Sequence, residues 1–244
     1  MTSVARENAV LVLKTGEALP PVKAARGDFE GWIARGMGVD ADTIEVASVY
    51  AGDGLPDPAS IGGVIVTGSP LMVTDRAEWS EASGRWLADV VESDAVPVLG
   101  ICYGHQLIAH ALGGEVGANP NGREMGTVEV RHDAAAIADD PVIVGVAEPG
   151  HMSHVESVLR PPSDTIVLGT TDLEAHAALR FGPRQWGVQY HPEFDREIMQ
   201  RYVEARREIL SSEGHDPDAL IGAAVETPVL TSVLERFATF VEKA

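Results

Sequence analysis

The residues best suited to chemistry lie where a run of apolar β-formers gives way to a helical pattern. Residues 96–114 read VPVLGICYGHQLIAHALGG, and Cys102, the chain's only cysteine, stands between Gly100 and Gly104. A strand that ends in Gly-x-Cys-x-Gly and continues into a helix is typical of a nucleophile elbow, a strained turn whose flanking positions carry no bulk. The N–H groups at the start of the helix favour a thiolate and can hold an oxyanion. The pattern predicts a nucleophilic cysteine, although a free cysteine without such neighbours usually packs as a small hydrophobe.

A thiolate that attacks a carbonyl needs a base, and the base needs an orienting group. In QWGVQYHPEF (185–194) a strand pattern ends, and His191 and Glu193 follow two residues apart. Residues i and i+2 of an extended chain point the same way, so the carboxylate can lie beside the imidazole, and Pro192 stiffens the pair. We therefore expect Cys102, His191 and Glu193 to act together.

The remaining histidines indicate no second site. His105 and His110 lie on the helix after the cysteine and are expected to pack as structural residues. His151 and His154 have a spacing that a metal could use, but no third ligand cluster accompanies them. We predict neither a metal site nor a cofactor.

The elements that must position these residues alternate between short apolar runs and helices. Strands are expected over 9–14, 43–49, 61–67 and 96–101, and helices over 22–37 (interrupted), 75–91 (capped by Asp75) and 104–112. Such alternation indicates βαβ units, and hence a parallel sheet covered on both faces. Short strands split by turns over 126–131, 165–169, 175–181 and 185–190 predict added antiparallel strands. The expected fold class is α/β, a three-layer sandwich around a mostly parallel twisted sheet.

The end of the chain is predicted to be helical, over 195–211 and again from Thr227. In the last helix Thr227 is the expected N-cap, Pro228 the first helical residue, and one face is apolar. That face consists of Leu230, Val233, Leu234, Phe237 and Val241. We expect a domain over 1–205 and a helical C-terminal extension over 206–244 packed on it.

Charge and composition exclude several classes of function. Lys and Arg number 18 against 37 Asp and Glu, so the formal net charge is −19, and such a surface repels nucleic acids and anionic membranes. No apolar run approaches the roughly 20 residues of a membrane span, and the first residues lack the apolar centre of a secretory signal. One cysteine makes no internal disulfide. We expect a soluble, cytoplasmic protein.

The motifs GICYGHQ (100–106) and QYHPEF (189–194), in this order and with a long gap between them, resemble those of the class I glutamine amidotransferases. In this triad family a flavodoxin-like catalytic domain supplies ammonia to partner synthetases. The resemblance covers about residues 9–205. It implies that Cys102 attacks the side-chain amide of glutamine, giving a γ-glutamyl thioester and ammonia, before water releases glutamate. It also implies that His191 is the general base and acid, and that Glu193 orients it.

The same resemblance assigns further residues around the cysteine. It implies an oxyanion hole of two backbone N–H groups, one from Tyr103 and the other from Ser69 or Gly68 in TGSP (67–70). It also implies that the substrate meets Gln106 and the segments REMG (123–126) and MSH (152–154), which include Ser153 and His154.

Two departures from the family leave the substrate open. The family often has two glycines before the proline where this chain has Gly68-Ser69-Pro70, and its GMP-synthetase members read S-H-G-D where this chain reads SHVES (153–157). Three functions remain. The first is an amidotransferase-type hydrolase that passes ammonia to a synthetase partner. The second is a stand-alone γ-glutamyl peptidase or hydrolase that acts on γ-glutamyl peptides or conjugates. The third is a binding or regulatory protein without turnover.

Overall fold

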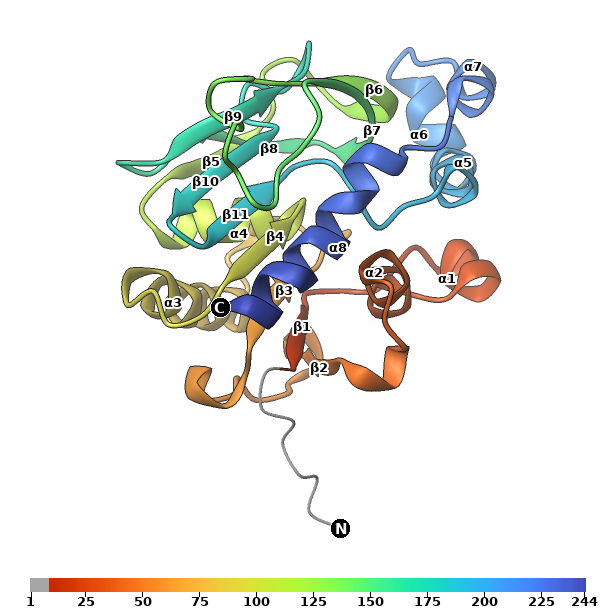
Figure 1. Ribbon diagram of the computed structural model, residues 1–244. Helices are drawn as coiled ribbons and strands as arrows, with labels where there is room; N and C mark the ends of the chain where they lie inside the picture. The colour runs from red at the N-terminus through yellow and green to blue at the C-terminus, as the bar shows by residue number, and fades with distance from the viewer. Residues whose placement is uncertain (1–8) are drawn as a thin grey trace.

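The computed structural model describes residues 9–244, and a nine-stranded mixed sheet lies at its centre (Figure 1). The strand order is β2-β1-β3-β4-β11-β10-β9-β6-β7. The first five strands in this order are parallel: β2 (Glu45–Ser48), β1 (Val10–Lys14), β3 (Gly63–Val66), β4 (Val98–Ile101) and β11 (Gln185–Val188). The α/β fold with a mostly parallel sheet is therefore confirmed.

The rest of the sheet is antiparallel, as three of the four short strand-like segments predicted. Its strands are β10 (Ala178–Gly182), β9 (Ile166–Thr170), β6 (Glu124–His132) and β7 (Ala147–His154). The fourth segment, 185–190, contains β11, and the expectation is wrong there because β11 pairs in parallel with β4 and is antiparallel only to β10. A separate pair consists of β5 (Glu115–Ala118) and β8 (Glu156–Arg160). The sequence does not predict β7, because Pro149 and Gly150 interrupt its pattern. Only Val155 separates β7 from β8, so the SHVES segment forms the corner between the two sheets.

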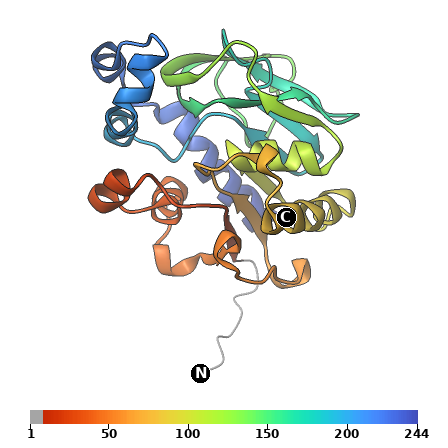
Figure 2. The same cartoon turned by 180° about the vertical axis from the view of Figure 1, so that it is seen from behind.

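Helices cover both faces of the sheet. The helices α2 (Phe29–Met37) and α8 (Pro228–Lys243) lie on one face, and α3 (Glu78–Glu92) and α4 (Tyr103–Ala111) on the other, seen from behind in Figure 2. Alternate residues of β1 serve the two faces: Val12 packs in the cluster that contains α8, whereas Leu11 and Leu13 pack against α3 and α4. This alternation produces the three layers.

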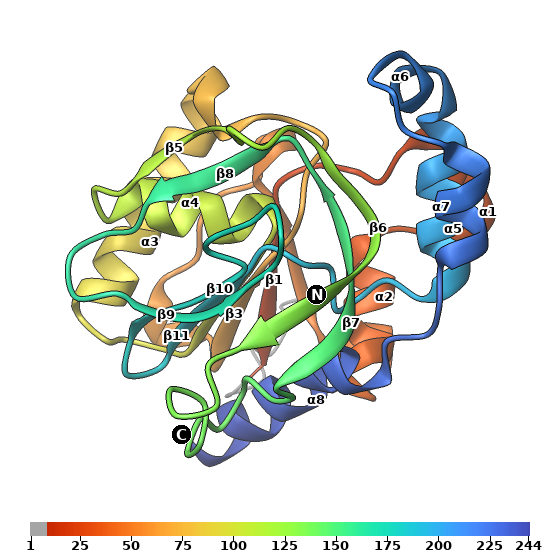
Figure 3. The same ribbon diagram turned by 90° about the horizontal axis from the view of Figure 1, so that it is seen from above.

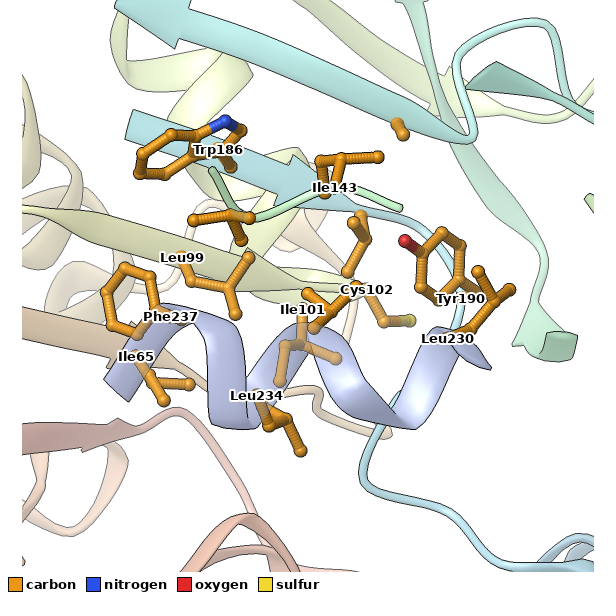
Figure 4. Packing of buried hydrophobic residues seen from close by; sticks show 14 of the residues in the cluster. Ile65, Leu99, Ile101, Cys102, Ile143, Trp186, Tyr190, Leu230, Leu234 and Phe237 are labelled. Carbon is orange, nitrogen blue, oxygen red and sulfur yellow. The ribbon is translucent and has the colours of Figure 1, made fainter. Parts of the chain in front are cut away.

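The helix α8 is part of the main core. Its predicted apolar face is confirmed, because all five residues from Leu230 to Val241 are buried in one cluster with the sheet. Figure 4 shows Leu234 and Phe237 facing Ile65 and Leu99. Thr227 is the N-cap residue, but its side chain makes no capping hydrogen bond. A domain boundary near residue 205 stays a prediction.

Two helix expectations need detail or correction. The interrupted helix is two helices, α1 (Pro20–Arg26) and α2, which are separated at Gly27 with φ of 80°. The expected capping of α3 by Asp75 is wrong. Asp75 ends a 3₁₀ turn, Arg76 then turns the chain with φ of 53°, and α3 begins at Glu78 without a side-chain cap.

Three helices between residues 196 and 223 gather at one side of the molecule, beside α1 (Figure 3). They are α5 (Arg196–Ala205), α6 (Arg207–Ser212) and α7 (Pro217–Ala223). The predicted helix over 195–211 therefore breaks at Arg206, whose φ and ψ are −111° and 12°. Ile198, Tyr202 and Leu210 pack in a third apolar cluster, which includes Phe194 next to the candidate site. No helix within residues 9–244 is both long and apolar enough to cross a membrane.

Candidate active site

The chain turns sharply at Cys102, between β4 and α4. Its φ and ψ are 50° and −101°, a region in which a residue with a side chain is strained. A Cβ at Gly100 would lie 2.6 Å from the backbone carbon of Gly104, and one at Gly104 would lie 2.4 Å from the carbonyl oxygen of Val66. Both positions therefore exclude a side chain, and the structure has the elbow geometry that the sequence indicates.

His191 and Glu193 follow β11 and lie beside this turn. The Nδ1 atom of His191 donates to Oε1 of Glu193 over 2.7 Å, and both residues are buried. Phe194 stacks on the imidazole at a centroid distance of 4.1 Å and an interplanar angle of 17°. A Cβ placed at Gly68 would be 2.9 Å from Cε1 of His191 and 3.7 Å from Cβ of Cys102. The structure therefore brings the three predicted catalytic residues together around Gly68.

The imidazole of His191 is held in its charged form. Burial lowers the pKa of His191, but the charges of Glu193 and Cys102, together with the hydrogen bond to Glu193, outweigh burial and raise this pKa to about 10. The thiolate is the nucleophilic form of cysteine, and an imidazolium beside it can hold the proton that a leaving group needs. The arrangement can therefore supply both a nucleophile and a proton.

A chain of two glutamines supports the cysteine. Gln189 Nε2 donates to Cys102 Sγ over 3.3 Å, and Gln106 Nε2 donates both to Gln189 Oε1 over 2.9 Å and to the carbonyl oxygen of Glu156 over 2.7 Å. Gln106 thus reaches the thiol through Gln189, a residue that sequence reasoning missed. The available signal was a glutamine at the end of a buried strand, two residues before His191.

The predicted oxyanion-hole groups lie on either side of the cysteine. No hydrogen bond described within residues 9–244 uses the N–H of Gly68, Ser69 or Tyr103. The Ser69 hydroxyl donates to the carbonyl oxygen of Thr15 over 2.9 Å and accepts from the N–H of Leu71 over 3.2 Å. The side chain therefore fixes the loop and leaves its N–H groups available.

A small polar pocket opens next to Cys102. Its wall contains the loop 69–72, Tyr103, Gln106, the segment 153–156 and two arginines, Arg123 and Arg206. The predicted substrate-binding residues Gln106, Ser153 and His154 thus share one pocket with the cysteine. Arg123 belongs to the predicted REMG segment, whereas Arg206 was not predicted to be near the site.

His154 uses its ring within the protein. Its Nδ1 lies 2.9 Å from the carbonyl oxygen of Glu156, and its Nε2 lies 3.1 Å from Oε2 of Glu124. The Glu156 carboxylate accepts from the N–H of Val73 over 3.1 Å and from the hydroxyl of Thr74. These contacts tie the pocket wall to the loop that follows Ser69, and they leave the His154 ring without a free nitrogen for a substrate.

The remaining candidates lie elsewhere. Burial, followed by the charges of His176 and His154, lowers the pKa of His105 to about 3, and this fully buried ring packs against Gly187 and Phe181. His110 is half-buried and contacts Arg76 and Glu81, away from the cysteine. Within the described part of the chain, no group of three or more His, Cys, Asp or Glu side chains is placed to hold a metal ion.

Relatives support this picture at the level of the family. The family model for glutamine amidotransferase class-I matches residues 41–206, more than half of the chain. The GMP synthase [glutamine-hydrolyzing] of Aeropyrum pernix is 36% identical over 182 residues, covering 73% of this chain and 31% of that protein. The corresponding enzyme of Leifsonia xyli is 40% identical over 136 residues, covering 54% of this chain and 25% of that protein. The chain thus spans about a third or less of the length of these curated relatives.

Solved structures show the same fold. A glutamine amidotransferase from Thermotoga maritima matches with a TM-score of 0.77 at 19% identity, covering 98% of this chain and 100% of that one. A glutamine amidotransferase from Methylobacillus flagellatus matches with a TM-score of 0.74 at 20% identity, covering 98% of this chain and 95% of that one. Taken with the family match, these findings show that the chain belongs to the class I glutamine amidotransferases.

Proposed function

We propose that this chain hydrolyses the γ-glutamyl amide of glutamine through a thioester on Cys102. The observation that supports the proposal most directly is the position of the thiol. It lies at a strained elbow, beside an imidazole that is hydrogen-bonded to Glu193 and has its pKa raised to about 10. In this arrangement His191 both maintains the thiolate and holds the proton that the leaving group needs.

The first half of the proposed reaction forms the acyl-enzyme. The Cys102 thiolate attacks the side-chain carbonyl carbon of glutamine, and the carbonyl electron pair moves onto oxygen. The oxyanion accepts hydrogen bonds from the N–H of Tyr103 and from that of Ser69 or Gly68. As the intermediate collapses, His191 gives its proton to the nitrogen, the C–N bond breaks, and ammonia leaves a γ-glutamyl thioester.

The second half hydrolyses the thioester. His191, now neutral, takes a proton from water, and the oxygen attacks the thioester carbonyl at the same oxyanion hole. The C–S bond breaks, glutamate leaves, and the thiolate and imidazolium are restored. Glu193 forms no bond in either half. It orients the imidazole and stabilises its positive charge.

We further propose that the ammonia serves a synthetase partner. The GMP synthases of Aeropyrum pernix and Leifsonia xyli match this chain over 31% and 25% of their own length, so those proteins contain a large part that this chain does not match. Ammonia released in a buried pocket is best used by a second active site that receives it directly.

A γ-glutamyl peptidase is the second candidate. Val155 and Glu156 stand where GMP-synthetase members have Gly-Asp, and the Glu156 side chain holds the loop at Val73 and Thr74. The pocket wall at residues 155–156 therefore differs from the Gly-Asp segment of GMP-synthetase members in both sequence and side-chain contacts. A γ-glutamyl peptide offers the same acyl group, so the same residues would cleave it with an amino acid or peptide as the leaving group.

A substrate screen with the purified chain tests both candidates. Glutamate and ammonia release would be measured with L-glutamine and with γ-L-glutamylglycine, for the wild type and for Cys102→Ala. Glutamine turnover that depends on Cys102 would support the amidotransferase proposal, and turnover of the peptide alone would favour the peptidase. If neither is cleaved and no glutamine-shaped electrophile labels Cys102, the chain binds or regulates without catalysis.

A further inference from the structure

One arginine at the pocket has no partner. Arg206 lies at the break between α5 and α6 and lines the same pocket as Cys102. Its Nε atom is buried without a hydrogen-bond acceptor, and no hydrogen bond or ion pair described within residues 9–244 uses its guanidinium. The helical segment after residue 205 therefore contributes a positive charge to the site.

This lack of a partner is unusual for an arginine of the described residues that is not exposed, since Arg35, Arg85 and Arg196, which also have none, are exposed. The formal net charge of the chain is −19, and the neighbouring arginines are paired. Arg207 contacts Glu204 at 2.7 Å and Asp218 at 2.8 Å, and Arg123, on the same pocket wall, contacts Glu213 through two bonds of 2.6 and 3.1 Å. A guanidinium stays charged in proteins, so leaving one partly buried without an anion is unfavourable.

The surroundings of Arg206 hold it in place and leave its donors available. Its guanidinium carbon lies 5.9 Å from the centroid of the Tyr202 ring, a distance at which the ring can support the cation. Burial and the charge of Arg123 lower the pKa of Arg206, while Tyr202 and Cys102 raise it. The guanidinium therefore lies close enough to Cys102 for the two groups to interact electrostatically. No carboxylate of the described residues neutralises the positive charge of Arg206.

We propose that Arg206 is the receptor for a carboxylate of the substrate, an inference that rests on the proposed γ-glutamyl chemistry. The guanidinium fork matches a carboxylate through two parallel hydrogen bonds. Every γ-glutamyl compound carries an α-carboxylate, and a γ-glutamyl peptide carries a second carboxylate on its leaving side. Both place an anion within a few bonds of the carbon that Cys102 attacks.

The single cysteine allows a test that does not depend on turnover. Iodoacetate and iodoacetamide alkylate the same thiolate, but only iodoacetate is an anion. The ratio of the two alkylation rates at Cys102 therefore reports the positive charge near it and cancels changes in thiolate content. We expect Arg206→Gln to lower this ratio about tenfold, as expected for the loss of one nearby charge. Arg206→Lys should keep most of it, and the exposed control Arg207→Gln should leave it unchanged. An Arg206→Gln ratio equal to that of wild type would overturn the proposal.

Kinetics of the same variants then identify the carboxylate. KM would be measured for L-glutamine, γ-L-glutamylglycine and γ-L-glutamylglycinamide. A KM raised about tenfold for all three by Arg206→Gln assigns the α-carboxylate, and a rise confined to γ-L-glutamylglycine assigns the leaving-side carboxylate. A KM that matches the Arg207→Gln control for every substrate would overturn the proposal. If the wild type cleaves none of them, the γ-glutamyl function fails, and the alkylation ratio still decides whether Arg206 attracts an anion.

Discussion

Two buried histidine–glutamate pairs flank the pocket of Cys102. They differ in whether the histidine has a ring nitrogen that is not hydrogen-bonded within the protein. In the first pair, His191 Nδ1 is 2.7 Å from Glu193, and the thiol of Cys102 lies close enough to raise the pKa of the ring. In the second, His154 Nε2 is 3.1 Å from Glu124, and its Nδ1 is 2.9 Å from the carbonyl oxygen of Glu156. The first can exchange a proton with a reacting group, whereas the second has both nitrogens committed to the protein. Catalytic ability in this site thus depends on a free nitrogen next to the nucleophile, and a buried His–Glu contact alone does not provide it.

The largest loss of activity should come from removing the thiol of Cys102, which lies between the two pairs. Cys102→Ala should lower kcat by at least about 10⁴-fold, because no other side chain in the pocket can form the thioester. Glutamate release would measure it. Alanine keeps the Cβ atom at this strained position, so thermal unfolding of the variant serves as the check that it folds. Wild-type turnover in Cys102→Ala would contradict the assigned nucleophile.

Breaking each pair at its histidine should separate the two roles. His191→Ala should lower kcat by about 10³-fold or more with little change in fold. His154→Ala should instead destabilise the protein by about 3 kcal/mol, because Oε2 of the buried Glu124 carboxylate loses its partner while Oε1 keeps only the hydroxyl of Thr171. It should lower kcat far less. Steady-state kinetics and urea unfolding of both variants test this. Equal losses of kcat in the two would mean that the pairs are equivalent and that our distinction is wrong.

Weakening the first pair without removing its histidine should have an intermediate effect. Glu193→Gln keeps the shape of the orienting group but removes its charge, so kcat should fall about 10- to 100-fold. The pKa of His191 should fall toward its ordinary value, and NMR titration of the ring would show it. A wild-type titration curve in Glu193→Gln would show that the carboxylate does not hold the imidazolium.

The same variant should change the pH dependence of stability. Folding raises the pKa of His191 from 6.5 to about 10, so protonation of this ring stabilises the native state. That contribution is fully present below pH 6.5 and is lost as the pH rises toward 10. Melting temperatures measured across this range should therefore decline in the wild type and decline less in Glu193→Gln. Parallel curves for the two proteins would contradict the linkage.

The smallest effect is expected at Gln189. Gln189→Leu removes the hydrogen bond to Cys102 Sγ and the partner of Gln106, and kcat should fall about tenfold. Gln200→Leu is a matched control that should leave kcat unchanged, because this half-buried glutamine of α5 also donates one hydrogen bond, to the carbonyl oxygen of Ile221 over 3.1 Å, but away from the cysteine. A wild-type kcat in Gln189→Leu would show that this contact is structural only.

The contrast between the pairs also explains how far the sequence can predict the site. His191 and Glu193 are neighbours along the chain, so their contact follows from local geometry. His154 and Glu124 meet because they are opposed in the register of β6 and β7, and β7 has no pattern that predicts a strand. The spacing His-x-Glu is not sufficient either. His154 and Glu156 share it, yet the Glu156 side chain turns to the N–H of Val73 instead of the imidazole.

The fold shows the same difference between features set by neighbouring residues, which the sequence predicts, and features set by packing between distant segments, which it does not. The parallel strands β1 to β4, the elbow and the apolar face of α8 follow from local patterns and were predicted, whereas the parallel pairing of β11 with β4 was not. Arg206 could not be assigned to the site, because its position depends on the break between α5 and α6 and on the packing of α5 against β6. The predicted cap of α3 was wrong for a local reason. Arginine rarely adopts a positive φ, so nothing in the sequence indicates that the chain turns at Arg76.

The most direct test of the proposed acyl-transfer site is covalent labelling of the isolated chain with diazo-oxo-norleucine, a glutamine-shaped electrophile. We predict one adduct per chain, at Cys102, which forms without a second protein and is suppressed by excess L-glutamine or a γ-glutamyl peptide. Labelling should be slow in His191→Ala and close to wild type in any His154→Ala that remains folded. Mass spectrometry that finds no adduct on Cys102, or an adduct that neither competitor slows, would contradict the claim that Cys102 and His191 form a γ-glutamyl acyl-transfer site.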